Sequence, residues 1–335
     1  MVKKISKFIA AVVIYVGFAV YLYRPYFGKF SGQQYLIVIN VCLASLGCLL
    51  LSRRWVSGFG GSFFAGIIYG FGPFVLLLAK FHPAAGFLAA VIPWLFLPAA
   101  FGPRARWRWL QVPLSVLPFL GIVLFFQVTS RYHLFAVPTQ IELRPADLVG
   151  LFAPLVMAGR GAVVVGFYHI PIAAFVMGVS MLLAARRLGV MVVLCIGVIL
   201  ALCEPFLGIS PIMWLTIPVL CCSIIIGAGA QGLVSAGSGD RKWLFVTAVI
   251  MAALSVAALL FAVQYFKIFA GLGEEYANLF AETARMYILG TIAVAIFYFL
   301  ARAKLRVHWL RWAVLGSAMA VDIFFGARFI VDKIF

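Results

Sequence analysis

The sequence predicts an all-α membrane protein that crosses the bilayer about eleven times. Hydrophobic residues make up 66% of the chain and charged residues only 10%, with a mean hydropathy of +1.15. Soluble domains carry charge on about a quarter of their residues. A membrane-spanning helix needs about 20 apolar residues to cross a hydrocarbon core about 30 Å thick, and long unbroken apolar runs do not arise from the alternating pattern of a membrane β-barrel.

Each expected span is an apolar run bounded by charged or turn residues. The first follows Lys3 and Lys4; no small-residue cleavage site follows it, so we expect a retained helix rather than a signal peptide. Small residues from Gly227 to Asp240 predict a helix end and a turn between the eighth span and the ninth. The expected spans are 7–24, 34–51, 59–80, 84–101, 110–128, 161–185, 188–204, 211–232, 243–266, 284–302 and 309–329.

Basic residues cluster in every second connection between these spans, so most of them lie on one side of the membrane. With the N-terminus inside, the cytoplasmic segments collect 16 of the 26 Lys and Arg residues and, among the acidic residues, Asp240. Six of the eight Trp residues lie beside those basic clusters, where amphipathic rings favour the headgroup zone. The pattern predicts a cytoplasmic N-terminus, an outer C-terminus and a bacterial-type cytoplasmic (inner) membrane location.

The chain is expected to form one integral membrane unit with two sequence regions. Residues 1–235 contain helices one to eight and an outer segment at 129–160, and residues 236–335 contain helices nine to eleven and an outer segment at 267–283. Within the first outer segment, the apolar stretch Leu148–Met157 is too short to span the bilayer. It is expected to lie at the interface or to dip back into the bundle.

Carboxylates are absent from the first 141 residues, which carry twelve Lys and Arg. Carboxylates are common general bases and the usual ligands of hard divalent metals. The first acidic residue is Glu142, and Asp147 follows it in the same outer segment. These two are the candidates for a catalytic role, although their spacing matches no recognised motif. The absence argues against an enzyme.

Four basic residues are expected on the outer face, where guanidinium and ammonium groups could bind the phosphate of a lipid-linked donor. The alternative is ordinary contact with lipid headgroups. The candidates are Arg131, Arg144, Arg160 and Lys80, accompanied by His82 and His133.

Two polar residues are expected within the membrane. His169 is the histidine placed well inside a span, and Asp322 lies in the last helix. The plain interpretation of each is a hydrogen bond to another helix. A proton or ion site at Asp322 is the alternative, because intramembrane carboxylates are often functional. A single pigment or haem contact at His169 is disfavoured, since a bis-histidine haem requires a second facing imidazole.

No cofactor or metal is predicted. The six Cys residues fall within expected helices and form no CxxC or Cys/His set with metal spacing. The net charge of +17 is spread over short loops rather than gathered in one patch, so membrane lipids, including anionic lipids, are the expected partners and nucleic acid is not.

Two regions resemble GT-C-type membrane glycosyltransferases, which use polyprenyl-phosphate sugars. The first comprises Asn40–Leu43, Leu49–Arg54 and Phe63–Phe74, and the second comprises Pro145–Pro154, Gly159 and Tyr168–Pro171. The resemblance implies an N-in helical bundle with an outward-facing site, a lipid-phosphate groove and one or two catalytic Asp in a long first outer loop. Here that loop is the short segment Arg24–Gln34, which has no carboxylate. The chain therefore resembles a degenerate member, a pseudoenzyme.

The function expected from these observations is that of a non-catalytic GT-C-like subunit, which serves as a scaffold or lipid-binding component of a multi-subunit membrane complex. One alternative is a glycosyltransferase-like enzyme that acts on a lipid-linked substrate at the outer face, with Glu142 or Asp147 in the catalytic role. A further alternative is an ion- or proton-coupled transporter that uses Asp322.

Overall fold

The structure is a computed structural model that describes residues 2–30, 32–81, 83–102, 109–132, 145–160, 164–184, 188–202, 207, 209–263, 274–303 and 307–335. Over these ranges the chain is helical and contains no β-strand. Nine helices in the described residues are long and apolar enough to cross a membrane, and two shorter apolar helices lie at Pro171–Leu183 and Gly189–Leu202. The predicted helical fold is confirmed over these residues, and the length and apolarity of the nine helices are typical of a membrane protein, whereas the count of eleven spans and their orientation stay predictions.

The first half of the chain forms a layer of long helices. The helices are α1 (Val2–Tyr23), α2 (Tyr35–Ser52), α3 (Phe59–Gly70), α4 (Pro73–Phe81), α5 (Pro83–Phe101) and α6 (Gln111–Arg131). Two 3-10 turns, η1 (Arg24–Lys29) and η2 (Gly32–Gln34), connect α1 to α2. The outer segment then contributes η4 (Pro145–Leu148), α7 (Val149–Phe152) and α8 (Pro154–Gly159).

The second half supplies the centre of the bundle and one of its sides. The helices are α9 (Pro171–Ala184), α10 (Leu188–Leu202), α11 (Pro211–Ser235), α12 (Arg241–Ala262), α13 (Glu274–Arg302) and α14 (His308–Ile334), with η6 (Ser238–Asp240) before α12. Helices α4, α5, α8, α9 and α11 all begin with Pro, which is favoured at a helix start because its missing N–H would have no partner there.

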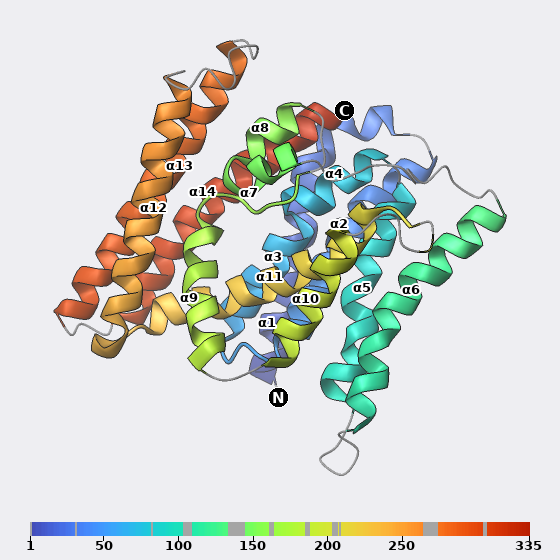
Figure 1. The fold of residues 1–335 in the computed structure, drawn as a ribbon, viewed down its shortest axis with the longest axis horizontal. Coiled ribbons are helices and arrows are strands. Elements are labelled where there is room, and N and C mark those ends of the chain that lie inside the picture. The colour runs from blue at the N-terminus through green and yellow to red at the C-terminus, as the bar shows by residue number, and fades with distance from the viewer. Residues whose placement is uncertain are drawn as a thin grey trace.

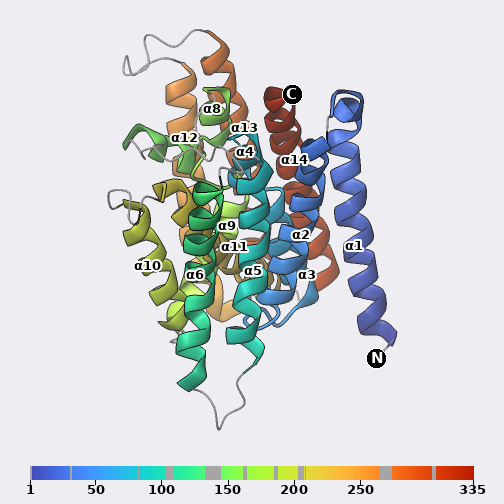
Figure 2. The same cartoon turned by 90° about the vertical axis from the view of Figure 1, so that its right-hand side faces the viewer.

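Helix α11 lies at the centre and packs against α3, α9 and α10. At Gly229 a Cβ would lie 1.6 Å from the carbonyl oxygen of Ala174, so the backbones of α11 and α9 are in close contact there. Helices α12 and α13 form a hairpin along one side of the bundle and α6 lies toward the other (Figure 1). The N- and C-termini lie at opposite ends (Figure 2).

Two expected spans are interrupted in the structure. The span expected at 59–80 is divided at Phe71 and Gly72 into α3 and α4. In the span expected at 161–185, the described residues are helical from Pro171 onward but not at 164–170. Before Pro171, residues 164–170 run without helix, although Val164, Tyr168 and Ile170 are fully buried. Proline disfavours the helical conformation of the residue before it, and so the helix cannot extend smoothly backward through Ile170.

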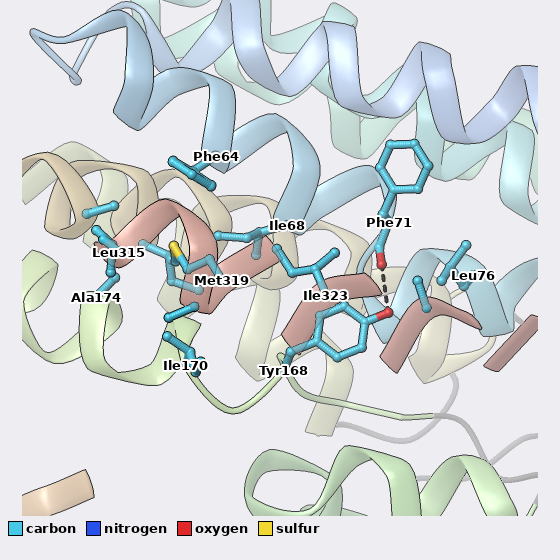
Figure 3. Packing of buried hydrophobic residues seen from close by; sticks show 14 of the residues in the cluster. Phe64, Ile68, Phe71, Leu76, Tyr168, Ile170, Ala174, Leu315, Met319 and Ile323 are labelled. Carbon is cyan, nitrogen blue, oxygen red and sulfur yellow. Dashed lines mark hydrogen bonds between the residues drawn. The ribbon is translucent and has the colours of Figure 1, made fainter. Parts of the chain in front are cut away.

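The two interruptions meet in the core. The Tyr168 hydroxyl donates a hydrogen bond of 2.8 Å to the carbonyl oxygen of Phe71 (Figure 3). Ile323 of α14 and Leu76 of α4 belong to the same buried cluster. An irregular backbone is tolerated at membrane depth only where protein or a water-filled cavity satisfies its polar groups. Here a buried tyrosine supplies one of the required donors.

Candidate functional site

The candidate site lies where the non-helical segment 164–170 meets α14. Asp322 is the fifteenth of the 27 residues of α14, halfway along a helix long enough to span a membrane. Its side chain is 2% exposed and that of His169 is 0% exposed. Among the acidic side chains of the described residues, Asp322 is the buried one.

Both carboxylate oxygens of Asp322 have partners. His169 Nδ1 lies 2.8 Å from Oδ1, and the backbone N–H of Ile170 donates to Oδ2 over 2.6 Å. Ile170 directly precedes α9, so the carboxylate lies at the positive end of that helix dipole. These interactions connect residues 153 and 152 positions apart in the sequence.

The imidazole of His169 also contacts the ring of Tyr287 in α13, edge to face, with 5.1 Å between the ring centroids. The Tyr287 hydroxyl is directed elsewhere and donates to the carbonyl oxygen of Phe152 over 2.6 Å. Nε2 of His169 is buried and has no hydrogen-bond partner within the described part of the chain. The pair thus joins α14 to the start of α9 while leaving one imidazole nitrogen unpaired there.

One turn along α14 from Asp322, Gly326 leaves room for the ring of Tyr168, the residue before His169. A Cβ at Gly326 would lie 2.2 Å from Cε1 of Tyr168. Asp322 and Gly326 share a helix face because they are four residues apart. This face of α14 therefore accommodates Tyr168, His169 and Ile170 together.

Sequence reasoning identified His169 and Asp322 separately, each as a polar residue within a span. The structure brings them into direct contact. Their pairing has no local sequence signal, since no motif spacing relates them. The usable signal was their chemistry: a buried carboxylate and a buried imidazole each need a partner, and they could satisfy each other.

The proposed outer-face phosphate ligands do not meet at a shared contact in the described residues. Arg131 ends α6 with its guanidinium over the Tyr132 ring, whereas Arg160 follows α8 and lies over the Tyr276 ring. Arg144 lies outside the described residues. Lys80 belongs to α4, but its side chain is outside the description, as are His82 and His133.

Of the two carboxylate candidates, Asp147 is the one within the described residues. Asp147 lies in the first turn of η4 and is half-buried, while Glu142 falls outside the described residues. The apolar stretch that follows forms α7 and α8, with Leu155 to Ala158 buried and α8 packed against α13 and α14. In the described residues no group of three or more His, Cys, Asp or Glu side chains could hold a metal ion.

The chain was compared with known protein families, curated proteins and solved structures. No protein-family model, curated protein or solved structure matches the chain.

A network of surface interactions, which the sequence did not predict, joins η1 to the end of α14. The Tyr26 hydroxyl donates to Oδ1 of Asp332, and Arg328 Nε donates to Oδ2 of the same carboxylate over 3.0 Å. Lys333 pairs with Glu275 at the start of α13 over 2.9 Å. These ion pairs are exposed, and exposed pairs contribute little to stability.

The buried side chain of Arg311 joins α14 to the C-terminal end of α11. Arg311, near the start of α14, is 3% exposed, and its Nη1 donates to the carbonyl oxygens of Val234 and Ala236. Helix α11 ends at Ser235, so the guanidinium caps carbonyls at the negative end of its dipole.

We predict that Arg311→Met destabilises the protein by about 1.5–3 kcal/mol, the range for hydrogen bonds made by a charged group. Methionine retains much of the apolar contact but cannot donate to either carbonyl. Thermal unfolding in detergent would measure the loss. Arg54→Met, at an exposed position just after α2, is the control, and equal effects of both changes would contradict the capping role.

A shallow apolar groove lies between α13 and α14. About 480 Å³ of empty space lies in this groove, including space that is open to the surroundings. Its lining residues are Leu289, Ile292, Ala293, Ile296, Val314, Ser317, Ala318 and Val321. Ala293 and Ala318 are buried, whereas Ile292 is 52% exposed. In each helix the lining residues follow the i, i+3, i+4, i+7 spacing of a single face.

Proposed function

We propose that this chain is a non-catalytic, GT-C-like subunit of a larger membrane complex, in which it serves as a scaffold and binds lipid. The groove between α13 and α14 is the observation that supports this proposal. Its two lining faces lie within helices long and apolar enough to span a membrane. The proposed location is a bacterial-type inner membrane.

A phospholipid acyl chain is the occupant that best fits the groove. The lining of each helix extends over seven residue steps, or about 10 Å at 1.5 Å per residue, which is short compared with a spanning helix about 30 Å long. The lining is almost wholly aliphatic, and the hydroxyl of Ser317 is already bonded to the carbonyl oxygen of Val314. An acyl chain requires no polar partner there.

Charge at one end of the groove favours an anionic headgroup. Helix α13 ends at the exposed Arg302, and α14 begins a few residues later with the exposed His308 and Trp309. Basic residues next to a span attract anionic lipids, and Trp favours the headgroup zone. We therefore propose a lipid with its headgroup near Arg302 and one chain along the groove.

A lipid at this position would support the scaffold role directly. Helix α13 packs extensively on α12 but contacts α14 much less. A chain in the groove would add van der Waals contacts between the hairpin and α14. Such packing contributes to helix association in membranes, where water exclusion gives little driving force.

Mass spectrometry of the protein purified in mild detergent, detecting polypeptides and lipids together, tests both parts. We expect stoichiometric partner polypeptides and a phospholipid that survives delipidation. Ser317→Phe places a ring in the groove and should reduce the retained lipid at least several-fold. Ala253→Phe, at an exposed site on α12 outside the groove, is the matched control and should retain it.

Each unfavourable outcome has a distinct meaning. Equal lipid retention in Ser317→Phe and the wild type would exclude the groove as the binding site. A wild-type protein that purifies alone from its native membrane would overturn the scaffold role. A polyprenyl-phosphate or sugar-linked lipid in the preparation would instead favour the enzyme alternative.

A further inference from the structure

We propose that His169 and Asp322 form an intramembrane proton-binding site, in which Nε2 of His169 accepts one exchangeable proton. This inference is independent of the scaffold role and of the lipid groove. It depends on three features of the described residues: the contact between the two side chains, their burial, and the unpaired imidazole nitrogen.

The hydrogen bonds determine where the exchangeable proton can bind. Oδ2 of Asp322 accepts the N–H of Ile170, and Oδ1 faces Nδ1 of His169. With Asp322 ionised, Nδ1 carries the hydrogen that lies between the two side chains. The lone pair of Nε2 then remains available. A hydronium ion that reaches the site transfers a proton to this lone pair and leaves as water, and no other bond changes.

Charge balance gives the reason that a proton should bind. Before it arrives, the pair carries one net negative charge in a buried position, and isolated buried charge is costly. After it arrives, an imidazolium faces a carboxylate and the net charge is zero. The Ile170 N–H and the positive end of the α9 dipole moderate the first state but do not neutralise it.

The described side chains around His169 and Asp322 include no second charged group that could pair with an imidazolium. From the segment before α9, Tyr168 donates to the carbonyl oxygen of Phe71; from α13, Tyr287 donates to that of Phe152. Beyond Tyr168, Tyr23 of α1 is the next buried phenol. Gly290 of α13 lies between Ile170 and Met251 of α12, and Met251 does not titrate. Among the described neighbours of the pair, the partner for an imidazolium is Asp322.

Binding of this proton would change the contact between α14 and the start of α9. A neutral imidazole with a carboxylate makes one hydrogen bond, whereas an imidazolium adds attraction between opposite charges. The protonated form therefore holds segment 164–170 more firmly against α14. Proton loss loosens the same contact.

Nitrogen-15 NMR of histidine-labelled protein in lipid nanodiscs provides the test, with His169→Gln used to assign the signals. Over about pH 5–8, where histidine commonly titrates, Nε2 of His169 should show one transition while Nδ1 stays protonated. In Asp322→Asn the amide preserves the side-chain size but removes the charge. The signal of protonated Nε2 at the acid end of this range should then be weaker than in the wild type, because the opposite charge that favours the imidazolium is lost.

Two outcomes would overturn the proposal. One is an Nε2 shift in the wild type that stays constant across the range, which shows that the nitrogen neither gains nor loses a proton. The other is an unchanged signal of protonated Nε2 in folded Asp322→Asn, which shows that the carboxylate does not govern binding. The wild-type titration decides the first point even if the variant does not fold, and lipid retention at the groove is unaffected by either result.

Discussion

Asp322→Ala is expected to lower the free energy of unfolding by about 2–5 kcal/mol. The variant leaves the Ile170 N–H and the His169 imidazole without their shared acceptor. Each buried polar group left without its partner costs about 1–3 kcal/mol, the desolvation penalty of that group. Unfolding in mixed detergent micelles, followed by tryptophan fluorescence, would measure the loss.

Asp332→Ala is the matched control, since it removes the same residue type from the same helix. The Asp332 side chain is 43% exposed, and its ion pair with Arg328 is at the surface. Exposed pairs are worth about 0–1 kcal/mol. Similar losses for the two variants would show that burial of Asp322 does not determine its contribution, contrary to the structure.

Gly229→Ala is expected to destabilise the bundle by about 1–3 kcal/mol or more through overpacking. The new Cβ would lie 1.6 Å from the carbonyl oxygen of Ala174 and 2.6 Å from the backbone nitrogen of Gly178. Both obstacles are backbone atoms of α9, so no side-chain rotation relieves the contact and the two helices must move apart. The same unfolding measurement applies.

Gly17→Ala provides the opposite expectation. A Cβ at Gly17 in α1 meets nothing within 4 Å, and alanine favours the helix over glycine by about 0.5–1 kcal/mol. Gly17→Ala should therefore leave stability unchanged or raise it slightly. Neutral behaviour of Gly229→Ala beside that control would mean that α9 and α11 are not in backbone contact.

Hydropathy located the helices well because a span is a local property of about 20 residues. Its limits appear where the backbone bends inside an apolar run. The run 59–80 gives no hydrophobic signal for the break at Phe71 and Gly72, since both halves are equally apolar. Pro171 did mark the start of α9, but composition alone favoured a continuous span across it.

The candidate site was predictable in its members but not in its arrangement. Ionisable residues are rare within spans, so His169 and Asp322 could be found by inspection. Their contact depends on how α14 crosses the start of α9, which involves packing between distant parts of the chain. The same reason explains why the link between Tyr26 and Asp332, 306 positions apart, had no sequence signal.

The separation of His169 and Asp322 also constrains how this protein is made. Translation and membrane insertion proceed from the N-terminus, so His169 is synthesised 153 residues before the carboxylate that binds it. Until α14 arrives, the Ile170 N–H and the His169 imidazole lack the acceptor that they have in the finished bundle. The contact between segment 164–170 and α14 can therefore form only after α14 has been synthesised.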